Sequence, residues 1–136
     1  MVTPEEGKAR LLRAAESGAL DEVCRRHGVR VLTVFGSAGR GEPGPGDLDV
    51  GVSFEPGVRP DVLGLATDLH DVAGREVDLG VVDGAAPLFR DRALMHATPV
   101  WESRPHEWIN SAVEAHMTAL DTAWLRRLDL DRLAGR

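Results

Sequence analysis

Residues 29–50 read VRVLTVFGSAGRGEPGPGDLDV, two apolar segments joined by a connection rich in glycine and proline. Val29 to Phe35 is short and rich in β-branched residues, which favours a buried strand. Gly36 to Gly46 has the composition of a loop, and Asp47 to Phe54 predicts a second strand. Polar residues therefore gather where the first strand ends and the second begins.

Asp47 and Asp49 begin the second strand, alternating with Leu48 and Val50. Side chains at positions i and i+2 of a strand point to the same face, so the two carboxylates project together while Leu48 and Val50 enter the core. Two such carboxylates repel each other, and burying an unpaired charge is costly. Mg²⁺ is commonly held by one or two carboxylates together with substrate phosphates. The pair therefore predicts a magnesium site.

Gly36 and Ser37 supply the second half of this predicted site. A glycine in such a turn allows close approach of the backbone, and the free N–H groups of the turn attract phosphate. The Ser37 hydroxyl adds a donor, whereas Arg40 either contacts a phosphate or forms a structural salt bridge. Asp78 is flanked by apolar residues, as Asp49 is, and joins the pair if its strand lies beside the second strand. Three acids around two metal ions suit phosphoryl chemistry.

The rest of the pattern alternates helices with short strands. Thr3 and Pro4 open a first helix, with Thr3 as N-cap and Glu6 completing a capping box, and Gly18 divides that helix in two. We further expect a helix at 60–73, a strand at 76–82, a helix at 88–96, an edge strand at 99–102 and a helix at about 104–134. This order predicts one α/β domain over residues 1–136.

The predicted C-terminal helix carries a continuous apolar stripe. Its members are spaced three or four residues apart: Ile109, Val113, Met117, Leu120, Trp124 and Leu128. Such a stripe is more often part of a core than an interface. A chain of this size has little to bury it against, so we expect part of the stripe to meet a partner.

Composition narrows the class of protein. The 136 residues have a formal charge of −6, from 16 basic and 22 acidic residues, so there is no basic surplus to neutralise nucleic-acid phosphates. The single cysteine excludes an internal disulfide. No apolar run approaches the roughly 20 residues that cross a bilayer. From the charge we therefore expect no nucleic-acid partner, and from the absence of such a run we expect no membrane partner and a cytoplasmic location.

Two further sequence patterns could suggest a binding site, but neither supports one. His96, His106 and His116 are ten residues apart, which puts them on no common helical face, so we expect surface histidines. Residues 39–44 (GRGEPG) match the dinucleotide pattern GxGxxG. That segment leads into a strand rather than a helix and contains Pro43, so we reject the match.

The motif residues resemble the minimal nucleotidyltransferase family of the DNA-polymerase-β-like superfamily. The family signature is an apolar residue, Gly-Ser or Gly-Gly, nine to thirteen residues, and Asp-apolar-Asp-apolar; here it is met by Phe35-Gly36-Ser37, a gap at 38–46 and Asp47-Leu48-Asp49-Val50. Arg40 and Gly41 complete the Gly-Ser-x-x-Arg-Gly form of small prokaryotic members, and Asp78 falls at the third acid. Gly46 and Gly51 depart from the usual pattern without touching a ligand.

The resemblance covers residues 29–102 and carries expectations for the whole chain. It implies the nucleotidyltransferase fold, with a small mixed sheet flanked by helices and a long C-terminal helix. It also implies two Mg²⁺ ions on the catalytic and metal-binding residues Asp47, Asp49 and Asp78, and a nucleoside triphosphate held by Gly36, Ser37 and Arg40.

The expected reaction is transfer of a nucleoside monophosphate, AMP from ATP as first choice, to a protein hydroxyl. Small prokaryotic members of this family often act as antitoxins beside a helical HEPN-type partner, which is the partner we expect. The alternatives are a non-catalytic nucleotide-binding or steric antitoxin, and a small-molecule transferase of the aminoglycoside type. The sequence leaves open the nucleotide, the acceptor residue and the oligomeric state.

Overall fold

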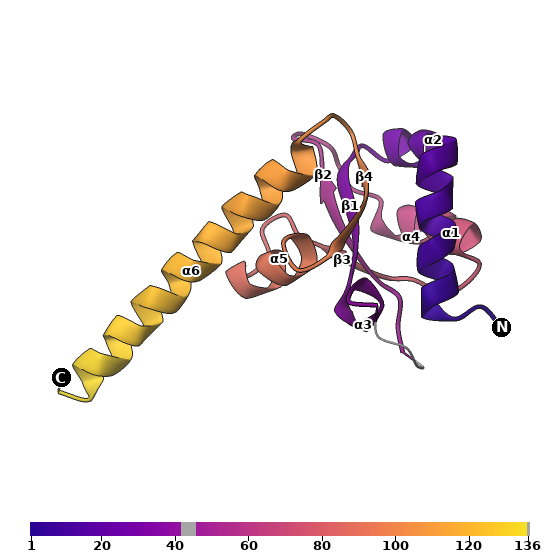
Figure 1. The fold of residues 1–136 in the computed structure, drawn as a ribbon. Coiled ribbons are helices and arrows are strands. Elements are labelled where there is room, and N and C mark those ends of the chain that lie inside the picture. Colours follow the sequence, from indigo (N-terminus) through magenta and orange to yellow (C-terminus); the bar gives the residue numbers. More distant parts are fainter. Residues whose placement is uncertain (42–45, 136) are drawn as a thin grey trace.

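The computed structural model describes residues 1–41 and 46–135, which build helices on both faces of a four-stranded sheet (Figure 1). The strands are β1 (Val29–Phe35), β2 (Asp49–Phe54), β3 (Asp78–Val81) and β4 (Thr98–Glu102), in the spatial order β3-β2-β1-β4. β1 is antiparallel to both β2 and β4, whereas β2 and β3 are parallel. The mixed sheet of the predicted fold class is confirmed.

The helices lie in two layers, one on each face of the sheet (Figure 1). The first layer consists of α1 (Pro4–Ser17), α2 (Ala19–Arg26) and α4 (Val62–Ala73). The second consists of α5 (Pro87–Leu94) and the long helix α6 (Glu107–Leu133). A single turn of helix, α3 (Gly36–Gly39), follows the end of β1.

β1 is buried on both faces because the two layers cover it. Leu32 and Val34 pack into the core beneath α1, α2 and α4, whereas Val31 and Phe35 pack beneath α5 and α6. The Thr33 hydroxyl, on the same face as Val31 and Phe35, donates to the carbonyl of Ala93 in α5. This two-sided burial explains why residues 31–35 (VLTVF) are all buried and do not alternate between apolar and exposed polar side chains.

The predicted N-cap and first-turn proline at the start of the chain are confirmed, whereas the side-chain half of the predicted capping box stays a prediction. The N–H of Glu6 donates to the Thr3 hydroxyl at 3.1 Å, and Pro4 is the first residue of α1. Gly18 adopts a left-handed conformation (φ 87°) and separates α1 from α2. A residue with a Cβ is strained in that conformation, so glycine divides the predicted helix at this position.

The connection between β1 and β2 differs from the expected loop, because its first four residues form α3. β2 also begins at Asp49 rather than Asp47, because Asp49 is the partner of Phe35, the last residue of β1. β3 begins at Asp78, the partner of Asp49, rather than at Glu76. Residues 42–45, which fall in the predicted loop and in the rejected GxGxxG match, lie outside the described residues.

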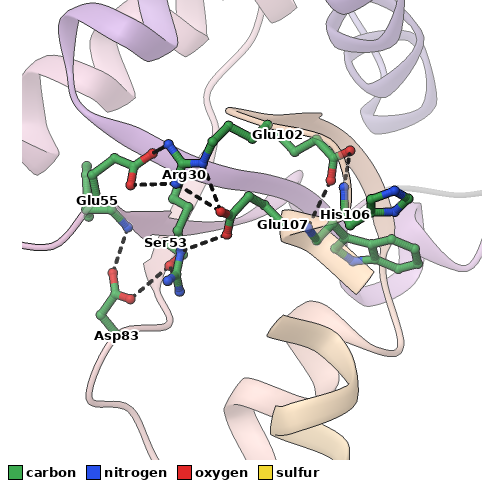
Figure 2. Close-up of polar contacts among 10 residues, drawn as sticks. Arg30, Ser53, Glu55, Asp83, Glu102, His106 and Glu107 are labelled. Atoms are coloured by element: carbon green, nitrogen blue, oxygen red, sulfur yellow. Dashed lines mark hydrogen bonds and ion pairs between the residues drawn. The ribbon is translucent and has the colours of Figure 1, made fainter. Parts of the chain in front are cut away.

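α6 starts at the end of the sheet that lies away from α3 (Figure 1). Polar contacts hold this first turn of the helix against the sheet (Figure 2). The Glu102 carboxylate accepts hydrogen bonds from the backbone N–H groups of His106 (3.3 Å) and Trp108 (2.9 Å). Arg104 forms ion pairs with Glu55 (3.1 Å) and with Glu107 (2.9 Å), and its guanidinium lowers the pKa of the Glu55 carboxyl. These contacts fix where α6 leaves the body of the protein.

The predicted core role of the apolar stripe on α6 is wrong. The buried residues of this helix are small, namely Ser111, Ala112, Ala115 and Ala119, and they lie against α5 and the sheet. The stripe residues lie on the exposed part of the helix surface, with Trp124 57% and Leu120 50% exposed. The face of α6 with small side chains is the buried one because small side chains let α5 and α6 approach each other closely. Within the described part of the chain, no helix is both long enough and apolar enough to span a membrane.

Candidate active site

Strand pairing brings three carboxylates together. Asp49 and Asp78 are directly opposite each other in the parallel pair β2–β3, so their side chains share one face of the sheet. Asp47 lies two residues before Asp49 and projects to the same side, while Leu48 and Val50 are fully buried beneath the other helical layer. One oxygen from each of the three carboxylates lies within 4.8 Å of the others. The geometry therefore unites the three acids that the sequence singled out.

The three charges act most strongly on Asp49. Burial raises the pKa of its carboxyl first, and the neighbouring carboxylates of Asp78 and then Asp47 raise it further. Arg92 opposes this rise because its positive charge favours the ionised form. A cluster of this kind, made only of oxygen donors and carrying excess negative charge, fits a hard divalent cation such as Mg²⁺.

Gly36 forms the wall opposite Asp49. Its φ is 69°, a left-handed conformation, and a Cβ at this position would overlap the Asp49 carboxylate. Glycine is therefore required here twice, once by the backbone conformation and once by the close approach of the carboxylate.

Several contacts hold α3 at the rim of the site. Gly39 passes so close to β1 that a Cβ would lie 2.5 Å from the carbonyl oxygen of Val34. The Lys8 ammonium donates to the carbonyl of Ala38 at 3.1 Å, and the Thr98 hydroxyl donates to that of Gly39 at 3.0 Å. These contacts position Arg40, the residue that follows α3.

A pocket of about 350 Å³ opens beside two of the carboxylates. Its lining combines predicted and unpredicted residues: Phe35, Gly36, Arg40, Asp49, Asp78, Gly80, Phe89 and Arg92. Ser37 is not part of this lining; it lies in the first turn of α3, where a Cβ at Gly46 would be 3.5 Å from its hydroxyl oxygen. A second cavity of about 310 Å³ shares Asp78 and is also lined by Asp47 and Arg75. The acids therefore border two cavities.

The pocket residues that the sequence did not predict are Gly80 of β3 and two side chains of α5, Phe89 and Arg92. Phe89 and Arg92 are three residues apart on α5, so they share one helical face. Phe89 packs edge-to-face on Phe35, with 5.6 Å between the ring centroids, and this contact helps to seat α5 over the site. The helix was predicted, but only its packing on the sheet reveals which face meets the carboxylates.

Comparisons with known proteins agree with this geometry. A Methanocaldococcus jannaschii protein, provisionally named a protein adenylyltransferase, is 36% identical over 77 residues, which cover 55% of this chain and 83% of that protein. A solved structure described as that of a minimal nucleotidyltransferase is 35% identical, covers 71% of this chain and 95% of its own, and superposes with a TM-score of 0.54.

A third relative shares the fold at low sequence identity. It belongs to a Shewanella oneidensis complex of a tri-AMPylated HEPN toxin with an MNT antitoxin, at 15% identity and a TM-score of 0.62, covering 94% of this chain and 98% of that one. The model of the nucleotidyltransferase domain family matches residues 17–100, which contain α3, the three carboxylates and both pocket residues of α5. The chain therefore belongs to the nucleotidyltransferase domain family.

Proposed function

We propose that this protein transfers AMP from ATP to a hydroxyl of a partner protein in a Mg²⁺-dependent reaction. The observation that carries the proposal is the convergence of three carboxylates beside a pocket walled by Gly36 and Arg40. A purely structural role requires no such cluster, because like charges held together destabilise the fold. The two helical layers on one sheet support a single nucleotidyltransferase domain over residues 1–136.

The three acids divide the metal-binding role. Asp47 and Asp49 would hold one Mg²⁺, and Asp78 would share the second. When bound, Mg²⁺ screens the charge of the triphosphate and lowers the pKa of the attacking hydroxyl. In the reaction, the hydroxyl oxygen bonds to the α-phosphorus, and the bond from that phosphorus to the bridging oxygen breaks, so that pyrophosphate leaves. Asp78 accepts the hydroxyl proton.

The remaining residues of the site bind the nucleotide. Gly36 allows the phosphates to approach the backbone, and the Ser37 hydroxyl donates a hydrogen bond to a phosphate oxygen. Arg40 lies at the rim of the pocket, where its positively charged guanidinium would bind the triphosphate. Arg92 faces the same pocket and adds a second guanidinium, a role that only the structure suggests.

A helical HEPN-type toxin is the acceptor that we propose, with this protein as its antitoxin. The net charge of −6 disfavours binding to a nucleic-acid backbone. The M. jannaschii relative is named for transfer to protein, and the S. oneidensis complex contains an AMPylated HEPN toxin. The exposed apolar stripe on α6 supports docking of a helical partner.

The test is incubation with labelled ATP and Mg²⁺, in parallel with the protein encoded by the neighbouring reading frame and with tRNA. Label on the protein, with a mass increase of one adenylyl group, supports the proposal. Label on RNA alone rejects it, and label on neither acceptor favours a steric antitoxin. The matched control is the double variant Asp47→Asn/Asp49→Asn, which should transfer nothing.

A further inference from the structure

Two histidines that are twenty residues apart meet at a carboxylate between α5 and α6. The Nδ1 atom of His116 lies 2.9 Å from one carboxylate oxygen of Asp91, and the Nε2 atom of His96 lies 3.3 Å from the other. The two imidazole rings pack edge-to-face with 5.8 Å between their centroids. Both histidines reach the surface, as expected from the sequence, with side chains 58% and 36% exposed, but they share a carboxylate partner that their spacing does not predict.

Local structure explains why these residues converge. Asp91 lies in the last turn of α5, which ends at Leu94. The backbone N–H groups of Met95 and His96 both donate to the Asp91 carbonyl, which folds His96 back over the helix end. On α6, the buried Ala112 and Ala115 let the backbone come close to α5, which brings His116 to the same carboxylate. The sequence spacing of the histidines carries no trace of this tertiary contact.

The arrangement has the dimensions of a metal site. One ligand atom from each of Asp91, His96 and His116 lies within 4.8 Å of the other two. In a tetrahedral zinc site with bonds of 2.0–2.1 Å, neighbouring ligand atoms are about 3.3 Å apart. Here His116 and His96 face different oxygens of the Asp91 carboxylate, at 2.9 Å and 3.3 Å, so an ion between the two rings can bind that carboxylate through one oxygen or both. Each ring only has to place its proton on the other nitrogen to offer a lone pair.

Burial and donor type also suit a bound cation. The Asp91 side chain is only 15% exposed, whereas that of His96 is 58% exposed, so an ion can enter from solvent and meet a largely buried negative charge. Two imidazole nitrogens and one carboxylate are a donor set for Zn²⁺ and related divalent transition metals. The three aspartates near Gly36 instead offer only oxygen, which suits Mg²⁺.

We propose that Asp91, His96 and His116 form a second metal site, which binds one divalent transition-metal ion, Zn²⁺ by preference, and crosslinks α5 to α6. Three protein ligands leave one tetrahedral position for water. Because α5 carries Phe89 and Arg92 into the active-site pocket, the ion ties the long helix to the helix that lines the pocket. The site stands independently of the proposed transfer reaction.

The test measures metal binding on the folded chain of 136 residues. We use the Asp47→Asn/Asp49→Asn background with excess Mg²⁺, so that the carboxylate cluster does not compete for the added ion. Saturating Zn²⁺ should raise the Tm by about 5 °C, because an ion that binds only the folded state stabilises it. Co²⁺ in place of Zn²⁺ should give visible absorption typical of a four-coordinate site.

His96→Gln and His116→Gln should each weaken Zn²⁺ binding by at least about tenfold, the lower end of the loss caused even by outer-shell changes at metal sites. His70→Gln, which removes an exposed histidine of α4, is the matched control and should bind as the parent does. Circular dichroism without metal establishes that each variant is folded. An unchanged zinc affinity in both cluster variants, or no Tm shift and no Co²⁺ absorption in the parent, would overturn the proposal.

Discussion

The Asp49 carboxylate is unfavourable for the stability of the fold but suited to binding a metal ion. It lies opposite Asp78 in the sheet and beside the wall formed by Gly36, and burial together with both neighbouring acids raises its pKa. The charge is therefore unfavourable in the folded protein without a cation. The same arrangement is what a divalent cation and a triphosphate require.

Asp49→Asn should separate these two effects. Removing the charge relieves repulsion, so without metal the Tm should hold or rise, as calorimetry can measure. Transfer of label from ATP should fall at least about a hundredfold, the scale typical of losing one electrostatic group at a reaction centre. A variant that unfolds more easily and still transfers label at the wild-type rate would contradict both the electrostatic argument and the assigned role.

Gly36→Ala should reduce transfer activity by more than the strain of a left-handed backbone at this position alone explains. The new Cβ would overlap the Asp49 carboxylate in addition to straining a left-handed residue. The control is Gly57→Ala, because Gly57 is also left-handed (φ 81°) but has nothing within 4 Å of an added Cβ. Strain of this kind costs about 1 kcal/mol, so Gly57→Ala should lose roughly that much stability and no activity. Equal loss of transfer in both variants would count against the close-approach argument.

Residues of the site were predictable from sequence only where the chemistry is local. The alternation of Asp47, Leu48 and Asp49 in one extended segment is enough to place two carboxylates together. Placing Asp78 in the site required the assumption that its strand lies beside the strand of Asp49, and the parallel pairing of β2 with β3 confirms that assumption. Arg92 and the pair of His96 and His116 depend on how α5 and α6 pack, and no spacing along the chain encodes those contacts.

At the scale of elements, periodicity identified helices better than it identified their buried faces. On α6 the large apolar residues formed the visible stripe, yet the alanine-rich face is buried because close packing of two helices favours small side chains. Strand ends were also misjudged by two residues at Asp47 and Glu76. A ladder begins where the neighbouring strand begins, and that limit is set by the partner rather than by the segment itself.

The start of α6 offers a prediction at this scale. His106 precedes the helix with a φ of 73° and is the one residue other than glycine with positive φ among residues 1–41 and 46–135. His106→Gly keeps the backbone N–H that donates to Glu102 and removes the left-handed strain, so it should stabilise the protein by about 1 kcal/mol. Thermal unfolding measures the change, with Arg104→Gln as a comparison that weakens the contacts of Figure 2 instead. A lower Tm for His106→Gly would show that the imidazole itself stabilises the turn.

At the scale of the whole molecule, the protein is a compact layered body from which α6 projects (Figure 1). The second half of this helix carries exposed Trp124, Leu125 and Leu128. Its first turns are fixed to the sheet and to α5, so the projecting part is held in a defined direction. A rigid apolar face presented in this way suits a helical partner that brings its own hydroxyl to the open pocket.

Trp124→Ala/Leu128→Ala should therefore weaken binding of the proposed HEPN-type partner without unfolding the chain. Both side chains are exposed, 57% and 39%, so truncating them should change stability by no more than about 0.5 kcal/mol each. Interface tryptophans that anchor a partner contribute about 2 kcal/mol or more, so titration calorimetry should show a loss of partner affinity of about thirtyfold. ATP binding should stay unchanged, because the substitutions lie far along α6 from the carboxylates.

The control is Leu63→Ala on α4, which removes an equally apolar side chain that is 80% exposed on the opposite helical layer. If both variants bind the partner as the wild type does, docking takes place elsewhere, and the direction of α6 serves some purpose other than presenting an acceptor to the pocket.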